Sequence, residues 1–486
     1  MAANPTPPST HSSTDPQQER SLKLLLWLVA VGFFMQTLDA TIVNTALPAM
    51  AASLGESPLR MQSVVVAYSL TMAMLIPASG WMADRFGMRR IYVGAILLFV
   101  LGSVLCAVSH SLTMLVTARV VQGLGGALLL PVGRLVVLRT FPRERFLQAM
   151  SFVAIPGLIG PLIGPTLGGW LVEAASWHWI FLINVPVGIL GALATLRHMP
   201  APAGVSAGRF DLAGYLLLAF GMVALSLALD GLSGLGLRQA SVLVLMIFGL
   251  ASLTAYWLHA LRRPDPLFSP TLFRVGSLRI GLLGNLFSRL GSSCMPFLIP
   301  LLLQVTMGYS PAQAGMMMLP VAIASMSMKK LTTPLITRHG YRRVLVVNTL
   351  LVGLTMASFA FASPEQPLAL RIAQLAVFGA VNSLQFTAMN TLTLKDLGPS
   401  TASSGNSLLS MVQMLAMGMG VAAAGAVLAA FTAFFGGEGA QTLSSFRATF
   451  ATMALITIAS AGIFWQLAEQ DSIAAPASRE QDVEAG

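Results

Sequence analysis

Long apolar stretches separated by short polar connections run along almost the whole chain. Each stretch has roughly the 20 residues that a helix needs to cross a bilayer. Lipid offers the backbone no hydrogen-bond partner, so every span must be helical. The pattern predicts an all-α integral membrane protein with about 14 transmembrane helices. The predicted spans are residues 22–49, 61–83, 91–109, 112–136, 147–171, 177–197, 212–229, 239–261, 277–303, 311–333, 344–362, 368–392, 404–432 and 448–467.

The composition agrees with this pattern and rules out a soluble enzyme. Hydrophobic residues make up 55% of the chain and charged residues only 9%, against about 25% charged in an ordinary soluble domain. Residues 1–20 are rich in Pro, Ser, Thr and Gln without an apolar core, which predicts a disordered cytoplasmic tail and not a cleaved signal peptide. Residues 469–486 are predicted to form a second cytoplasmic tail.

The net charge of +10 reflects the membrane topology of the chain and does not indicate nucleic-acid binding. If alternate connections lie on opposite sides of the membrane, 22 of the 28 Lys and Arg residues fall on one side and four on the other. Cytoplasmic connections carry such an excess. Both termini are therefore predicted to be cytoplasmic. The two remaining cations, Arg119 and Arg289, lie inside predicted spans.

Charged residues within spans are candidates for function, because each costs about 2.5 to 3.5 kcal/mol at the centre of a helix on insertion scales. Asp39 lies in the first span with Gln36 one turn before it. Such a carboxyl could load and release a proton, or it could be a static anchor between helices. Arg119 shares a helical face with Gln122 and could hold a carboxylate or an anionic substrate. Arg289 either faces a cavity or snorkels to an interface.

Glycines and prolines mark two further segments. The span 147–171 has small residues four apart, which form a groove for a partner helix, with prolines that let the helix bend: Gly160, Pro161, Gly164, Pro165, Gly168 and Gly169. The connection GWMADRFGMRR after the second span is a tight charged turn that contains Gly80, Asp84, Arg85, Gly87, Arg89 and Arg90. A plain positive-inside loop explains its arginines but neither its acid nor its glycines.

These motifs together resemble the major facilitator superfamily, specifically its fourteen-span drug:proton antiporter branch. The likeness covers the whole hydrophobic body and includes LDATIVNTALP (38–48), the GWMADRFGMRR turn, the Arg119–Gln122 motif, the glycine-rich fifth span and WHWIFLINVPVG (177–188). The resemblance implies two six-helix bundles, 21–198 and 263–468, with two inserted helices and linkers at 199–262. It also implies proton coupling through Asp39 and Arg119 and a conformational switch in the charged turn.

Two departures from the family pattern bear on the substrate. Arg338, Gly340, Arg342 and Arg343 repeat the spacing of the charged turn, but Thr337 stands where an acid is expected. Members that export cationic drugs often carry an acid in the thirteenth span, whereas this chain has amides there. Polar residues that could line a substrate cavity are Gln36, Gln122, Arg289, Asn382, Gln385, Asn406 and Gln413.

The favoured interpretation is a proton-coupled multidrug exporter of the bacterial inner membrane that works by alternating access. The alternative is an exporter of a small organic anion or its metal chelate, such as citrate, which the cations Arg119 and Arg289 favour. The sequence shows no HExxH, GxSxG or phosphate-loop motif, which argues against an enzyme or an ATP-driven pump. We expect no cofactor and no metal site; the expected partners are the lipid bilayer, protons and a small-molecule substrate, and the functional unit is expected to be a monomer.

Overall fold

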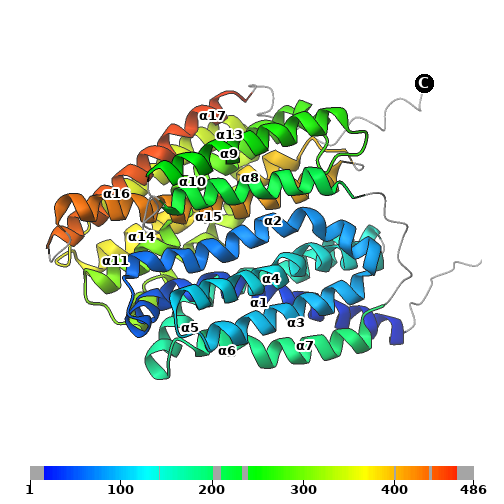
Figure 1. The fold of residues 1–486 in the computed structure, drawn as a ribbon, viewed down its shortest axis with the longest axis horizontal. Helices are drawn as coiled ribbons and strands as arrows, with labels where there is room; N and C mark the ends of the chain where they lie inside the picture. Colours follow the sequence, from blue (N-terminus) through cyan, green and yellow to red (C-terminus); the bar gives the residue numbers. More distant parts are fainter. Residues whose placement is uncertain are drawn as a thin grey trace, which may run out of the picture.

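The computed structural model describes residues 16–141, 143–200, 210–231, 239–398, 401–436 and 440–467, and the regular structure in these ranges is helical throughout. Most of the two predicted tails lies outside the described residues. The first helix begins at Pro16, ahead of the boundary predicted at residue 21. The helices form two bundles that lie side by side: α1 to α7 lie lower in Figure 1, and α10, α13 and α15 to α17 lie above them, together with α8 and α9.

The first bundle holds the polar network described below. Its helices are α1 (Pro16–Leu54), α2 (Gln62–Phe86), α3 (Met88–Ala107), α4 (Leu112–Thr140), α5 (Arg143–Ala174), the short α6 (Trp179–Leu182) and α7 (Asn184–His198). A 3-10 turn, η1 (Pro58–Met61), precedes α2. Polar caps set where several of these elements begin. The Ser111 hydroxyl, for example, accepts from the Met114 backbone N–H at 3.2 Å at the start of α4.

The second bundle is also built from helices, but more of them are interrupted. It contains α10 (Gly276–Ser292), α11 (Met295–Val305), α12 (Pro311–Met316), α13 (Leu319–Ser358), α14 (Leu368–Leu394), α15 (Ala402–Phe435), α16 (Ala440–Ala459) and α17 (Ala461–Trp465). Short 3-10 turns, η2 (Pro270–Arg274) and η3 (Phe359–Phe361), precede α10 and follow α13.

Two helices lie between the bundles in the chain, α8 (Leu212–Gly231) and α9 (Gln239–Arg262). They pack against each other, and α8 also contacts α2 and α15, one helix from each bundle. Asp211 secures the start of α8 because its carboxylate accepts from His259 Nε2 at 2.8 Å and from the backbone N–H groups of Gly214 and Leu267. This carboxylate joins α8, α9 and the connection that leads to α10.

Within the described residues, twelve helical stretches are long and apolar enough to cross a membrane. One of them, Pro311–Phe361, covers two predicted spans, and within α13 the backbone leaves helical geometry only at Gly340 (φ 75°, ψ 162°). The loop predicted between residues 333 and 344 is thus reduced to one glycine. Gly87 separates α2 from α3 in the same way (φ 89°, ψ 134°). A positive φ favours glycine, which explains why both copies of the repeated turn contain one.

The two bundles meet tightly at the end where α5 approaches α12. Thr166 of α5 donates its hydroxyl proton to the Gly315 carbonyl at 3.2 Å. The Glu173 carboxylate accepts from the Ser310 hydroxyl at 3.0 Å and from the Ala312 backbone N–H at 3.3 Å. Gly169 faces the carbonyl of Pro311, where a Cβ would meet backbone atoms. These contacts close the space between the bundles at this end.

Candidate functional site

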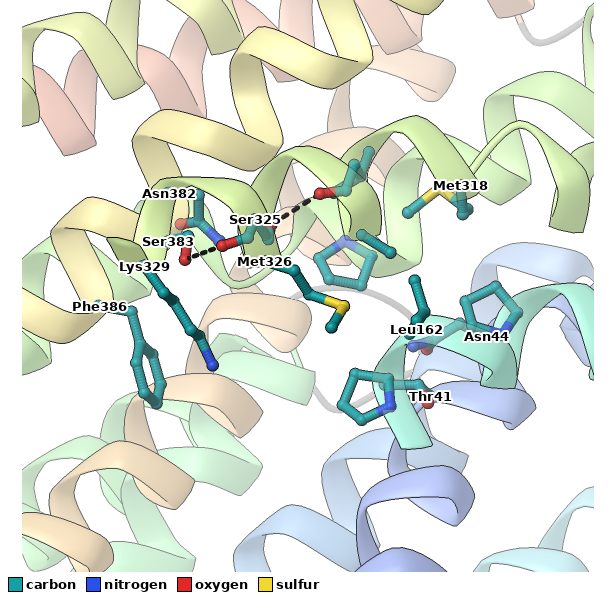
Figure 2. A pocket seen from close by; sticks show the side chains of 15 residues that line it. Thr41, Asn44, Leu162, Met318, Ser325, Met326, Lys329, Asn382, Ser383 and Phe386 are labelled. Atoms are coloured by element: carbon teal, nitrogen blue, oxygen red, sulfur yellow. Dashed lines mark hydrogen bonds between the residues drawn. The ribbon is translucent and has the colours of Figure 1, made fainter. Parts of the chain in front are cut away.

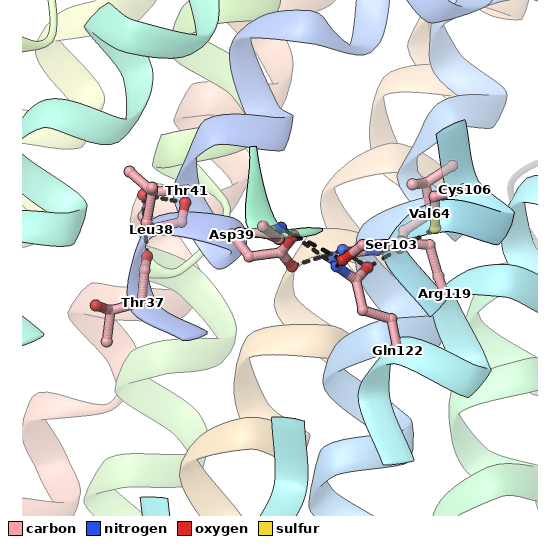
Figure 3. A network of polar contacts seen from close by, with 10 residues as sticks. Thr37, Leu38, Asp39, Thr41, Val64, Ser103, Cys106, Arg119 and Gln122 are labelled. Carbon is pink, nitrogen blue, oxygen red and sulfur yellow. Dashed lines mark hydrogen bonds and ion pairs between the residues drawn. The ribbon is translucent and has the colours of Figure 1, made fainter. Parts of the chain in front are cut away.

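An ion pair lies inside the first bundle between α1 and α4. Asp39 Oδ2 accepts from Arg119 Nη1 at 2.7 Å, and the two side chains are 0% and 1% exposed. Figure 3 shows the two groups pointing toward each other from their helices. Asp39 and Arg119 are thus in direct contact, which the sequence alone could not establish.

Neutral donors complete the surroundings of the carboxylate. Gln122 Nε2 donates to Asp39 Oδ1 at 2.8 Å and to the Ser103 hydroxyl at 2.9 Å. Asn184 Nδ2, from α7, donates to Asp39 Oδ1 at 3.3 Å. Four helices, α1, α3, α4 and α7, therefore meet at this network. An ionised carboxylate is stabilised here because each oxygen has a donor, which offsets the cost of removing its charge from water.

The guanidinium of Arg119 is held from several sides. Its Nε donates to the Val64 carbonyl of α2 at 3.3 Å, and its Nη1 donates to Gln122 Oε1 at 2.5 Å. The Tyr68 ring lies beneath it with the centroid 4.1 Å from Cζ. These contacts fix its orientation toward Asp39.

The glycine-rich segment of α5 receives α1, as the small-residue spacing predicts. A Cβ at Gly160 would lie 2.7 Å from the Leu38 backbone nitrogen, and one at Gly168 would lie 2.6 Å from the Ile42 carbonyl. At Gly164 the nearest neighbours belong to Thr41. Glycine is required for this approach, since any side chain would displace backbone atoms of α1.

A cavity of about 280 Å³ lies between the bundles, on the side of α1 away from Asp39. Figure 2 shows Lys329 and Phe386 at one end and Thr41 and Asn44 at the other. Its walls come from α1, α5, α11, α13 and α14, and consist of Thr41, Asn44, Pro161, Leu162, Pro165, Pro296, Met318, Val321, Ala322, Ser325, Met326, Lys329, Asn382, Ser383 and Phe386.

The cavity takes in few of the residues proposed for it from the sequence. Asn382 lines it directly. Arg289 lies behind the wall, with its guanidinium 4.2 Å from the centroid of Phe386 and its Nε donating to Asn285 Oδ1 at 3.0 Å. Gln36 is buried and its Oε1 has no hydrogen-bond partner.

The other amide candidates bond to neighbouring side chains and do not line this cavity. Gln385 Nε2 donates to the Thr349 hydroxyl at 2.7 Å, inside the second bundle. Gln413 Nε2 donates to Asn390 Oδ1 at 2.6 Å. Asn406 accepts from Arg134 Nη1 of the first bundle at 3.5 Å.

The charged turn at Gly87 is bonded within the first bundle. Asp84 Oδ1 accepts from Arg139 Nη2 of α4 at 2.5 Å. Arg89 donates to the Leu196 carbonyl of α7. Arg85 and Arg90 are exposed, and Gly80 has open space where a side chain would stand. The turn therefore ties α2 and α3 to α4 and α7.

Sequence reasoning missed three side chains of these sites. Asn184 belongs to the WHWIFLINVPVG motif, but no charge marked it as a partner of Asp39. Lys329 is one of the 22 cations that the charge count places on the cytoplasmic side, near the end of the predicted span 311–333, whereas it lines the cavity. Asn44 also lines the cavity; its position on the first span, five residues after Asp39, was the one available signal. Among the described residues no group of three His, Cys, Asp or Glu side chains could hold a metal ion.

Comparison with known proteins places these features in a family. Residues 29–421 match the Major Facilitator Superfamily. The chain is 54% identical over 411 residues to the protein MdtD of Serratia proteamaculans, whose name denotes multidrug resistance, covering 85% of this chain and 86% of that one. It is 51% identical over 448 residues to MdtD of Pectobacterium atrosepticum, covering 92% and 96%.

A crystal structure of a mutant of the peptide transporter POT in complex with sulfate has the same fold, with a TM-score of 0.69 at 15% sequence identity, covering 92% of this chain and 94% of that one. Because the family match spans most of the chain and the relatives are more than half identical over most of its length, the chain belongs to the Major Facilitator Superfamily of membrane transporters.

Proposed function

We propose that this protein is a proton-coupled multidrug efflux transporter of the bacterial inner membrane, which exchanges substrate for protons by alternating access. The relatives named for multidrug resistance support the export of drugs. The observation that carries proton coupling is the fully buried Asp39 carboxylate, paired with Arg119 and bonded to Gln122. A buried acid in a membrane protein is costly and is typical of proton relays.

In the proposed mechanism a proton binds the Asp39 carboxylate and removes its charge. The attraction to Arg119 then weakens, and the guanidinium keeps the Val64 carbonyl and the Tyr68 ring as partners. This change loosens α1 from α4. Since α1 also lies in the glycine groove of α5, a shift of α1 alters the wall of the cavity that Thr41 supplies.

The membrane topology is part of the proposal. We propose fourteen spans, obtained when the long stretch Pro311–Phe361 is divided at Gly340 and α5 is added to the apolar stretches. The bundles 21–198 and 263–468 would rock about the cavity, with 199–262 inserted and both termini cytoplasmic. The α5–α12 contact would then seal the outer side, and the turn with Asp84 would act as the cytoplasmic switch. We propose a monomer as the functional unit.

The test is substrate-induced proton movement in proteoliposomes with an imposed pH gradient. A panel of amphipathic drugs of positive, neutral and negative charge is compared with citrate, in the wild type, Asp39→Asn and Glu56→Gln. Glu56 is a matched control, because it pairs with Arg60 at 2.6 Å on the surface. Drug-dependent proton movement that Asp39→Asn abolishes and Glu56→Gln retains is expected. Proton movement that survives Asp39→Asn would contradict the proposed coupling site.

A second candidate, export of a small organic anion or its metal chelate, is favoured by the charges near the cavity. Among the described residues of the cavity wall, Lys329 is the one with an ionisable side chain, and Arg289 behind Phe386 has an Nη2 without a partner. Arg119 no longer supports this candidate, because it is occupied by Asp39. A response to citrate alone in the same assay would favour the second candidate.

A further inference from the structure

We propose that Lys329 selects the charge of the substrate, so that the cavity takes amphipathic molecules with one carboxylate, an apolar body and a hydrogen-bond donor at the far end. The inference rests on the proposed function, since it names the substrate class of the proposed transport cavity. It assigns a role to a lysine that the charge pattern alone places among topology-setting residues.

The charge at one end of the cavity is positive and uncompensated. Lys329 has no ion pair with any carboxylate of the described residues, and neither has Arg289. The two cations flank Phe386, which lines the cavity and stacks against Arg289. A carboxylate would supply the missing counter-charge, whereas a cationic ligand would add a third positive charge in a region of low dielectric.

The middle of the cavity is apolar. Leu162, Pro165, Pro296, Met318 and Met326 supply hydrocarbon and thioether surface, and Met326 projects between the two ends in Figure 2. A polyanion such as citrate would place its further carboxylates against these walls without a cation to pair with. The walls therefore favour one charge joined to an apolar body, and thioether side chains can adapt to bodies of different shape.

The far end offers an acceptor. Asn44 is 6% exposed, lines the cavity, and has a side-chain oxygen with no hydrogen-bond partner. The neighbouring Thr41 hydroxyl cannot satisfy it, because it already donates to the Thr37 and Leu38 carbonyls at 3.1 Å. Buried acceptors are normally bonded, so a donor on the ligand would complete this end of the site.

Three indole compounds test the charge preference, because they share body and N–H donor and differ mainly in charge. Indole-3-acetate is an anion, indole-3-acetamide is neutral and tryptamine is a cation. Equilibrium binding is measured by calorimetry on the purified full-length protein in nanodiscs, without a pH gradient. The wild type is expected to bind the anion at least about tenfold more tightly than the other two, as a charge-assisted contact provides.

The variants separate the role of the charge from folding. Lys329→Gln is expected to lose about tenfold in affinity for indole-3-acetate and to keep the affinity for indole-3-acetamide within about twofold. Lys329→Arg is expected to retain the preference. The matched control is Lys330→Gln, because Lys330 is the next residue and is exposed; it is expected to behave as the wild type. Retained affinity for indole-3-acetamide shows that the cavity is intact.

The acceptor end has its own test. 1-Methylindole-3-acetate lacks the donor and is expected to bind the wild type about tenfold more weakly than indole-3-acetate. Asn44→Leu is expected to bind the two anions equally.

The proposal is overturned if Lys329→Gln keeps the preference for the anion, or if the wild type prefers tryptamine or binds none of the three indoles. Because binding needs no proton gradient, a failure of proton coupling at Asp39 leaves these results unchanged. Antiport of cationic drugs through Asp39, with no preference for the anion, would overturn the inference alone.

Discussion

Replacing Arg119 by leucine leaves the Asp39 carboxylate buried without a counter-charge. Removing one partner of a buried ion pair costs about 3 to 5 kcal/mol. The free energy of unfolding of Arg119→Leu is therefore expected to fall by about 3 to 5 kcal/mol.

Asp39→Asn leaves the opposite group, a buried guanidinium that stays charged, without its counter-charge. The loss of stability is expected to be of similar size, about 3 to 5 kcal/mol. The remaining partners of the guanidinium are the Val64 carbonyl and Gln122 Oε1.

Reversible unfolding by SDS titration in mixed micelles measures these differences. Arg60→Leu is the matched control; it removes a cation from an exposed pair with Glu56 and should change the free energy by less than about 1 kcal/mol. The double variant Asp39→Asn/Arg119→Leu should recover most of the lost stability but not proton movement. A loss below about 1 kcal/mol for Arg119→Leu, or additive single penalties, would refute the reasoning.

Two further predictions concern packing and the inserted helices. Gly160→Val places a side chain where the α1 backbone lies 2.7 Å from an ideal Cβ, and should lower the free energy of unfolding by about 1 to 3 kcal/mol. The control Gly191→Ala has open space at its Cβ and should leave this free energy unchanged. An equal loss in both variants would contradict the close packing of α1 against α5. Burial raises the pKa of Asp211, but hydrogen bonds from His259 and two backbone N–H groups outweigh it, so the pKa lies below its usual value. The contribution of Asp211 to the stability of the fold is thus complete above about pH 4 and is lost as the pH falls through the folded-state pKa. Thermal melting scans from pH 6 to pH 3 should therefore show a steeper fall in melting temperature for the wild type than for Asp211→Asn.

The buried network was predictable from the sequence because charge within an apolar stretch is costly enough to be conspicuous. Asp39 and Arg119 stand out for that reason, and Gln122 follows from its position one turn after Arg119. The glycine groove of α5 was predictable because spacing by four places small residues on one face. The role of Asn184 was not predictable, because an amide within a span has no comparable free-energy cost. Its hydrogen-bond partner also depends on how α7 packs against α1 and α3.

The residues of the cavity wall were largely unpredictable, because they too depend on how the helices pack. The polar segment after Lys329 was interpreted as the end of a span, but the helix continues to Gly340, so Lys329 lies deeper than its charge suggests. Among the seven polar residues proposed for the cavity, the structure places Asn382 in this cavity wall. Gln122, Gln385, Asn406 and Gln413 bond to neighbours, since an amide inside a bundle finds partners on adjacent helices when they are available. Arg289 lies behind the wall, and Gln36 is buried with an Oε1 that has no partner.

The positions of the two sites on α1 restrict how proton and substrate can influence each other. Asp39 and Thr41 are two residues apart, which places them about 200° apart around a helix with 3.6 residues per turn. One faces the ion pair with Arg119 and the other lines the cavity. Under the proposed mechanism, a ligand at Thr41 would therefore act on the carboxylate through the position of α1 and not by contact. If one position of α1 favours the protonated carboxyl and the other favours bound substrate, each ligand must shift the affinity for the other by the same factor. Filling the groove at Gly160 should then change this coupling, because it displaces the backbone of α1 next to Asp39.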